Sequence, residues 1–394
     1  MSSTPGAGRP PLWFIYAVTM AGILANTMLT PNIPDILADL GQPQSRAGLL
    51  VAVGPLPGIV VAPIIGIAAD RFGRRKALLP CLVLFGVMGL AAAIAPTFET
   101  LLLARFGQGI GSAGLINLAV VLIGDNWEGN ERTTLVGRNS AVLTLGLVLA
   151  PSVSGFIAEI ANWRWSIAVT TVGLLVAAAG ARVLPAHRPG SPVTVREQLG
   201  ATRVQLRSPV ILTVIVGVFL LFVVIFGVFL TTFPVHLENE FGLGPGARGL
   251  VLSSPSIGAT LVAFNLGRIR QRFALRVVLV ASCTLITLAA IGIGLAPSLI
   301  IVVIASVVYG FGDGAAIPIL QDVATSEASA EQRGAVMAAW VSSARLGQTV
   351  GALAAAPLFD ATSTGFAMVV GGALFAVVAA VFAFAPLATR TEPM

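Results

Sequence analysis

Long apolar runs constrain this chain more than any other feature of its sequence. Stretches of about 20 residues with few or no charges recur along it, and a helix of that length crosses a hydrocarbon layer of about 30 Å. Mean hydropathy is +0.93, and only 10% of the residues are charged, whereas 56% are hydrophobic. Because an open chain satisfies its backbone hydrogen bonds inside a bilayer only as helices, the sequence predicts an all-α integral membrane protein.

The runs predict twelve transmembrane helices. Limits inferred from hydropathy are approximate by a few residues. The expected spans are 12–34, 47–69, 77–97, 99–123, 134–158, 164–184, 209–233, 248–267, 276–296, 298–320, 334–357 and 363–386.

The basic residues predict the orientation. With the N-terminus inside, eighteen Lys and Arg residues fall on cytoplasmic connections and only Arg46, Arg164 and Arg248 on external ones. Since cytoplasmic loops carry an excess of basic residues, both termini are expected to be cytoplasmic. The net charge of +6 does not indicate nucleic acid binding, because these residues are scattered over short loops. Only one of the 23 is Lys, which suggests a GC-rich bacterial genome and therefore the bacterial inner membrane.

The two halves of the sequence resemble each other. A shift of 201 positions aligns several loop residues, which indicates an internal duplication. We predict a six-helix half at 1–185, a cytoplasmic linker at 186–208 and a second, pseudo-symmetric six-helix half at 209–394. Such paired halves are typical of transporters in which one half rocks against the other. The shift places Gly66, Arg71, Phe72 and Arg75 on Gly267, Arg272, Phe273 and Arg276.

The charged loop after the second run carries the most specific motif, GIAADRFGRRK at 66–76. It resembles the loop signature of the major facilitator superfamily, and the twelve runs and the repeat extend the resemblance over nearly the whole chain. Gly66 is expected to allow close helix approach and Gly73 a tight turn. The signature positions are Gly66, Asp70, Arg71, Gly73, Arg74 and Arg75.

The resemblance implies that Asp70, Arg71 and Arg74 latch the cytoplasmic side in the outward-open state. Asp70 is an anion suited to the positive N-terminal end of a helix in the other half, and the helix that starts near Arg333 is the candidate. Alternatively, these charges only orient the loop.

Two further motifs resemble those of drug:proton antiporters within the superfamily. RFGQGIGSAG at 105–114 resembles a fourth-span motif, and GLVLAPSVSG at 146–155 a fifth-span antiporter motif, although Ala150 and Ser154 replace usual glycines. Helix packing alone is the alternative explanation of the fifth-span motif. The matching positions are Arg105, Gln108, Gly109 and Gly111 in the first, and Gly146, Pro151 and Gly155 in the second.

Ionisable residues inside membrane spans are costly to bury and are candidates for function. We expect Asp313, inside the tenth run, to carry the coupling proton, with Arg345 of the eleventh setting its proton affinity. The alternative is that the two neutralise one another. Arg105 is expected to serve coupling or a structural network, with snorkelling as the alternative. Asp35, at the external end of the first run, is a further candidate, although it also fits a helix end.

A substrate cavity is expected to be mainly apolar, with few polar groups. Asn26 and Asn117 are candidate hydrogen-bonding residues, and Phe222 and Phe226 candidate wall residues. The phenylalanines at 219, 222, 226 and 229 share one face of a regular helix. Interhelical hydrogen bonding and helix packing are the alternatives.

These features together predict a secondary active transporter that works by alternating access and exports amphipathic small molecules or drugs in exchange for protons. A facilitator or a proton symporter for a small metabolite is the first alternative, and a polytopic membrane enzyme the second. His187 and His236 lie in separate loops without metal-ligand spacing or paired carboxylates, so we expect no enzyme, metal or cofactor. The expected partners are substrate, protons and the lipid bilayer, without nucleic acid, and the chain is expected to be monomeric.

Overall fold

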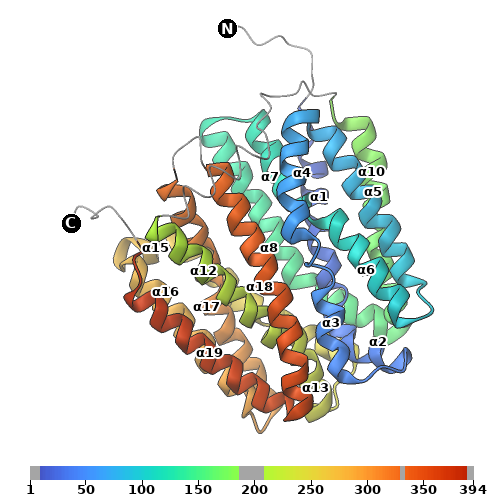
Figure 1. Cartoon of the computed structure of the whole chain (residues 1–394), viewed down its shortest axis with the longest axis vertical. Helices are drawn as coiled ribbons and strands as arrows, with labels where there is room; N and C mark the ends of the chain where they lie inside the picture. Colours follow the sequence, from blue (N-terminus) through green and yellow to red (C-terminus); the bar gives the residue numbers. More distant parts are fainter. Residues whose placement is uncertain (1–8, 186–207, 329–332, 388–394) are drawn as a thin grey trace.

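The computed structural model describes residues 9–185, 208–328 and 333–387. Every regular element in these ranges is a helix, and most helices run along the long axis of the molecule (Figure 1). The predicted all-α membrane fold is therefore confirmed. The predicted linker lies outside the described residues except for Ser208, and so do the two ends of the chain.

We call the helices before the predicted linker the first half of the bundle and those after it the second half. The first half contains α1 (Leu12–Thr27), η1 (Thr30–Asn32), α2 (Ile33–Asp39), η2 (Gln44–Arg46), α3 (Ala47–Ala52), α4 (Gly58–Phe72), α5 (Arg74–Ala93), α6 (Phe98–Ser112), α7 (Leu115–Asn126), α8 (Gly129–Ile160), α9 (Trp163–Ala168), η3 (Val169–Thr171) and α10 (Val172–Val183). The second half contains α12 (Pro209–Val224), η4 (Ile225–Thr232), α13 (Phe233–Phe241), α14 (Pro245–Ser253), α15 (Pro255–Arg272), α16 (Leu275–Gly294), α17 (Leu299–Glu327), α18 (Arg333–Ala361) and α19 (Thr364–Phe384).

Ten helical stretches in the described part of the chain are long and apolar enough to cross a membrane. They correspond to ten of the twelve predicted spans. The second predicted span is divided into α3 and α4 around Pro55 and Pro57, because proline lacks a backbone donor and interrupts a helix. The eleventh is α18, whose 29 residues extend about 43 Å. For these two stretches the crossing of the membrane stays a prediction.

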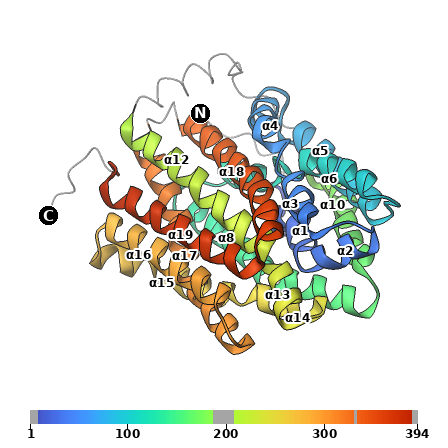
Figure 2. The same ribbon diagram turned by 60° about the horizontal axis from the view of Figure 1, so that its bottom comes forward.

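Buried apolar side chains form two clusters, and their division shows where the halves meet. One cluster lies entirely within the first half and joins α1, α5, α7 and α10. The larger cluster fills the second half and also includes Ile33, Leu50 and Val51 of the first. The halves therefore share apolar packing where α2 and α3 lie. We call this end of the bundle, with α2, α3, α13 and α14, the closed end (Figure 2).

Polar contacts between the halves follow the same division. At the closed end Gln44 and Asn239 exchange two hydrogen bonds of 2.9 Å, and the Ser152 and Ser253 hydroxyls lie 2.8 Å apart. The opposite end holds the loop 70–75, and we call it the loop end. Among the described residues, the ion pairs at the loop end stay within one half. In the described part of the chain, polar contacts therefore bridge the halves at the closed end and again where Ser342 of α18 donates to the Ile59 oxygen of α4, but no ion pair bridges them at the loop end.

Candidate functional site

The 66–76 motif folds into a sharp turn at the loop end. Gly73 has φ +94°, a conformation that favours glycine, and it ends α4 and begins α5. Arg74 bonds to Asp70, and its Nε donates to Asp125 at the end of α7 at 2.8 Å. Arg71 is exposed and lies over the ring of Phe72. The motif thus forms an ion-pair network inside the first half.

Two expectations for this loop are not met in this conformation. Asp70 pairs with Arg74, and among the described residues no hydrogen bond or ion pair joins it to α18 near Arg333. A Cβ on Gly66 would have no heavy atom within 4 Å, so no close helix approach occurs there. Gly267, its counterpart after the 201-residue shift, is equally open. Among the described residues, the hydrogen bonds and ion pairs of this loop all stay within the first half.

The duplicated arginines make matching contacts in the two halves. Arg75 donates to the backbone oxygens of Ala181 and Leu184, at 2.6 and 3.2 Å. Arg276 donates to Ala383 and Ala385 at 2.6 and 3.0 Å, at the end of α19. Arginine thus binds the free carbonyls at the C-terminal end of a helix in each half, where a cation is favoured.

Arg105 lies at the centre of a buried network in the first half. Its side chain is buried on α6, and Nη1 donates to the Ala25 oxygen at 2.7 Å and to Gln108 Oε1 at 2.6 Å. Nη2 donates to Asn26 Oδ1 at 3.2 Å, and Gln108 Nε2 donates to Thr170 Oγ1 at 2.9 Å. No carboxylate pairs with Arg105 among the described residues. The guanidinium therefore ties α6 to the end of α1, and Gln108 extends the network to η3. The guanidinium also occupies the Asn26 oxygen that was expected to face a substrate.

The glycines of the fourth-span motif lie at helix crossings. A Cβ on Gly109 would collide with the backbone oxygen of Gly54, just before α4. One on Gly111 would lie 2.5 Å from the Phe85 nitrogen on α5. The motif therefore packs α6 tightly against two neighbouring elements.

The fifth-span motif lies where α8 of the first half meets α14 of the second. A Cβ on Gly155 would collide with the Pro245 oxygen, and the Pro151 oxygen approaches Gly249 in the same way. Gly146 instead packs against side chains of α1. Two of the three motif positions thus bring the backbones of the two halves together at the closed end.

Ser154, which replaces a glycine of this motif, makes hydrogen bonds within the first half. It is fully buried, its hydroxyl donates to the Met28 oxygen at 2.7 Å, and it accepts from Asn32 Nδ2 at 2.9 Å. The Ser154 side chain, which a glycine would lack, therefore connects α8 through hydrogen bonds to the segment between α1 and α2.

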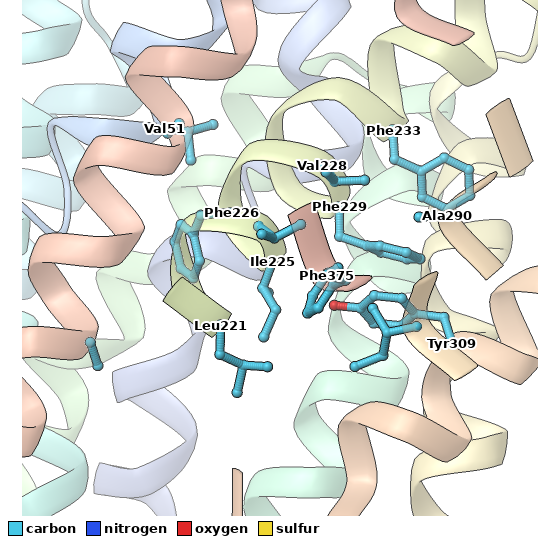
Figure 3. Packing of buried hydrophobic residues seen from close by; sticks show 14 of the residues in the cluster. Val51, Leu221, Ile225, Phe226, Val228, Phe229, Phe233, Ala290, Tyr309 and Phe375 are labelled. Carbon is cyan, nitrogen blue, oxygen red and sulfur yellow. The ribbon is translucent and has the colours of Figure 1, made fainter. Parts of the chain in front are cut away.

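Asp313 lies one turn after Tyr309 on α17, on the side that faces η4. The Tyr309 ring stacks on Phe229 with centroids 3.6 Å apart, and Figure 3 shows both rings in the buried cluster. Asp313 Oδ1 is buried without a hydrogen-bond partner, and so is the Tyr309 hydroxyl. Two unsatisfied polar atoms thus lie on one face of α17.

Arg345 does not neutralise Asp313 in this structure. Within the described ranges no ion pair joins them. The Arg345 Nε instead lies 3.2 Å from the position that a Cβ on Gly58 would take, at the start of α4. Close by, Ser342 Oγ donates to the Ile59 oxygen at 2.8 Å. Arg345 therefore lies against the other half, on the contact between α18 and α4.

The candidate cavity residues separate into different surroundings. The ring of Phe222 lies 6.2 Å from those of Phe226 and Trp340, whereas Phe229 stacks on α17. The single aromatic face expected from a regular helix is absent because η4 is π-helical, with a wider turn that changes the angular spacing of side chains. Phe226 is buried and Asn117 on α7 is exposed.

Arg248 is the functional candidate that the sequence reasoning missed. It was expected to be only one of three external loop cations, yet its side chain is 1% exposed and pairs with Asp35 of the other half. The available signal was its position among so few external basic residues. His236 is also buried, on α13 rather than in a loop, and its Nδ1 lies 3.0 Å from Thr364 Oγ1. In the described part of the chain no three side chains form a metal-binding group.

Comparisons with known proteins agree with this fold. The bacillibactin exporter of Bacillus subtilis (strain 168) is 34% identical over 158 residues, which cover 38% of this chain and 39% of that protein. The quinolone resistance protein NorA of Staphylococcus aureus (strain Mu50 / ATCC 700699) is 33% identical over 136 residues, covering 34% and 35%. The chain thus matches about two fifths or less of the length of these relatives.

Solved structures match over nearly the whole chain. A D-xylose-proton symporter superposes with a TM-score of 0.77 at 18% identity, covering 95% of this chain and 96% of its own. A bacterial homolog of the human lysosomal transporter Spinster, inward-facing and unoccupied, gives 0.75 at 18% identity and covers 94% and 95%. At these identities the likeness shows the fold.

The family model of the Major Facilitator Superfamily matches residues 15–352 and 226–393. Its members are transporters, which sets aside the membrane-enzyme alternative, and its fold is that of a multi-pass membrane protein. From the loop signature, the bundle described above and this match, the chain belongs to the Major Facilitator Superfamily.

Proposed function

We propose that the chain is a secondary active transporter that works by alternating access and exports amphipathic small molecules in exchange for protons. The observation that carries the proposal is the bridging of the halves at the closed end, while the motif residues at the loop end bond within their own half. Rocking of one half against the other produces such an arrangement.

The excess of basic residues at the loop end supports a cytoplasmic location for this end. With that orientation and both termini inside, the structure is the conformation closed to the outside. The Asp70 latch implied by the superfamily signature is released in this conformation, and Asp70 and Arg74 keep each other paired until the loop end closes.

Asp313 is the proposed proton carrier. Its Oδ1 has no donor, and Arg345 lies against the other half, so a proton can bind without the loss of an ion pair. An ionised carboxylate that is buried without a cation is costly in free energy. The protonated form of Asp313 is therefore favoured when its carboxyl group is buried, and the ionised form when it is exposed to water. Alternation of the bundle changes that enclosure, and proton uptake thereby becomes coupled to conformation.

The proposed direction of transport and the proposed substrate class are supported by observations other than the closed end and Asp313. The proposal of export is supported by the similarity to the bacillibactin exporter and to the quinolone resistance protein NorA, each of which matches only part of the chain. The aromatic group of Phe222, Phe226 and Trp340 supplies an apolar surface for an amphipathic substrate. We propose that the chain acts as a monomer in the bacterial inner membrane.

The test uses purified protein in liposomes that contain a pH-sensitive dye. A proton gradient is imposed and lipophilic cations, with tetraphenylphosphonium as the first probe, are added to wild type, Asp313→Asn and Asp322→Asn. Asp322 lies on the same helix, is exposed, and serves as the matched control. We expect substrate-driven proton movement in the wild type and the control and none in Asp313→Asn. Transport of the cation without proton movement in the wild type would refute the coupling and favour a facilitator.

A further inference from the structure

Arg248 is buried at the closed end between carboxylates of both halves. Its side chain is 1% exposed, and Nη2 donates to Oδ2 of Asp35 on α2. Nη1 lies 3.8 Å from Oε2 of Glu238 on α13. Asp35 belongs to the first half, whereas Arg248 and Glu238 belong to the second. One guanidinium therefore has an ion pair across the interface and another within its own half.

A third carboxylate holds the same helix from the first half. Glu159, near the end of α8, accepts a hydrogen bond from the Gly246 nitrogen at 3.0 Å, in the first turn of α14. The amides at a helix N-terminus carry partial positive charge, so this contact also attracts α14 to the first half. In the part of the chain that the structure describes, Asp35 and Glu238 thus pair with Arg248, and Glu159 bonds to the backbone of the same helix.

The two ion pairs of Arg248 respond differently when the halves separate. The pair with Asp35 joins α2 to α14, so separation of the halves at the closed end would break it. The pair with Glu238 joins α13 to α14, which lie together within one half (Figure 2), so separation of the halves would leave it in place. Removing the sole partner of a buried charge is strongly destabilising, so a second partner lowers the cost of giving up the first.

We propose that Arg248 is the gate cation of the closed end: its pair with Asp35 holds the halves together, and Glu238 takes over the guanidinium when they part. The inference rests on the alternating access proposed above. Asp35 thereby has a positioning role at the gate and stabilises the closed state. Glu238 has the opposite effect and stabilises the open state, since without Glu238 the guanidinium depends on Asp35 alone.

The experiment measures how often the closed end opens. Spin labels are attached to Pro43→Cys and Glu240→Cys, both exposed at this end, in a protein whose buried Cys81 and Cys283 are replaced by Ala. Pulsed electron paramagnetic resonance in lipid nanodiscs gives the distance distribution between the labels. The fraction of molecules at the longer distance is the open population.

We expect Asp35→Asn to raise the open-to-closed ratio about fivefold, a modest value because Asp35 is about one third exposed. Adding Glu238→Gln to Asp35→Asn is expected to lower the ratio below that of Asp35→Asn alone. The matched control is Asp39→Asn on the same helix, since Asp39 pairs with Arg164 inside the first half, and it is expected to leave the ratio unchanged.

Equal shifts in Asp35→Asn and Asp39→Asn would overturn the gate, and a further rise on adding Glu238→Gln would overturn the transfer of Arg248. If Asp35→Asn does not fold, the exchanged pair Asp35→Arg with Arg248→Asp replaces it and is expected to close the end more than Asp35→Arg alone. The proton-flux assay tests a different hypothesis. If the label distances respond as expected but the protein shows no proton flux, the proposed proton coupling is rejected and the proposed gate is retained.

Discussion

Replacing Gly155 by alanine tests the backbone contact between α8 and α14. The new Cβ would collide with the Pro245 oxygen and lie 2.9 Å from the Pro245 carbonyl carbon and 3.2 Å from the Gly246 Cα. Carbon atoms in contact are about 3.5–4.0 Å apart, so the two helices must separate by roughly 1 Å. Both obstructing groups are backbone, and no rotamer change relieves the collision.

Overpacking of this kind costs about 1–3 kcal/mol. The cost falls on the closed conformation alone, because α8 and α14 separate when the closed end opens. We therefore expect Gly155→Ala to raise the open-to-closed ratio about 5- to 150-fold. Gly137→Ala is the matched control, since Gly137 lies on the same helix near the loop end with no heavy atom within 4 Å of its Cβ position.

The assay follows the labelling of Ser253→Cys by a membrane-impermeant maleimide in the protein without native cysteines. Ser253 is 8% exposed at the interface, so the reagent reaches it only when the closed end opens. Faster labelling is expected in Gly155→Ala and an unchanged rate in Gly137→Ala. An unchanged rate in a folded Gly155→Ala protein would refute the argument that this contact exists only in the closed state.

Three further outcomes follow from the described contacts. Arg105→Lys keeps the charge but loses the planar fork of donors that binds three acceptors. We therefore expect substrate transport to fall, and the thermal midpoint to fall by the equivalent of about 1–3 kcal/mol for each acceptor left unpaired. Ser154→Gly restores the motif glycine but removes one of the two hydrogen bonds that Asn32 Nδ2 donates, leaving the bond to the Met28 oxygen. It is expected to lower the midpoint by the equivalent of about 1 kcal/mol, and an unchanged midpoint would show that the lost bond is not stabilising. Arg75→Gln and Arg276→Gln are expected to lower the midpoint by similar amounts, since they remove matching contacts, and a large difference between them would contradict that equivalence.

Hydropathy alone was sufficient to predict the all-α membrane fold and ten of the membrane spans. It did not predict where a proline interrupts a helix. The prolines at 55 and 57 divide the second span into α3 and α4, because their missing donors matter more than apolar character. The tight turn expected at Gly73 is present, with φ +94°, whereas the spacing of the motif did not indicate the carbonyl partners of Arg75.

The partners of individual side chains were not predictable, because they depend on rotation about each helix axis. Asp313 and Arg345 lie at similar depths in sequence, yet packing turns Arg345 toward Gly58. A π-helical segment separates Phe229 from the other phenylalanines of its span. The ion pair between Arg248 and Asp35 was not predictable either, since only the folded chain brings α14 to Asp35.

Alternation between the two ends is the central claim, and one pair of distances tests it. Spin labels at Pro43→Cys with Glu240→Cys report the closed end, and labels at Lys76→Cys with Gln271→Cys report the loop end; all four positions are exposed. Both pairs are measured in nanodiscs with and without tetraphenylphosphonium and at two values of pH. The account predicts that the population with a longer closed-end distance grows as the population with a shorter loop-end distance grows. Distances that change together in the same direction, or not at all under any of these conditions, would contradict it.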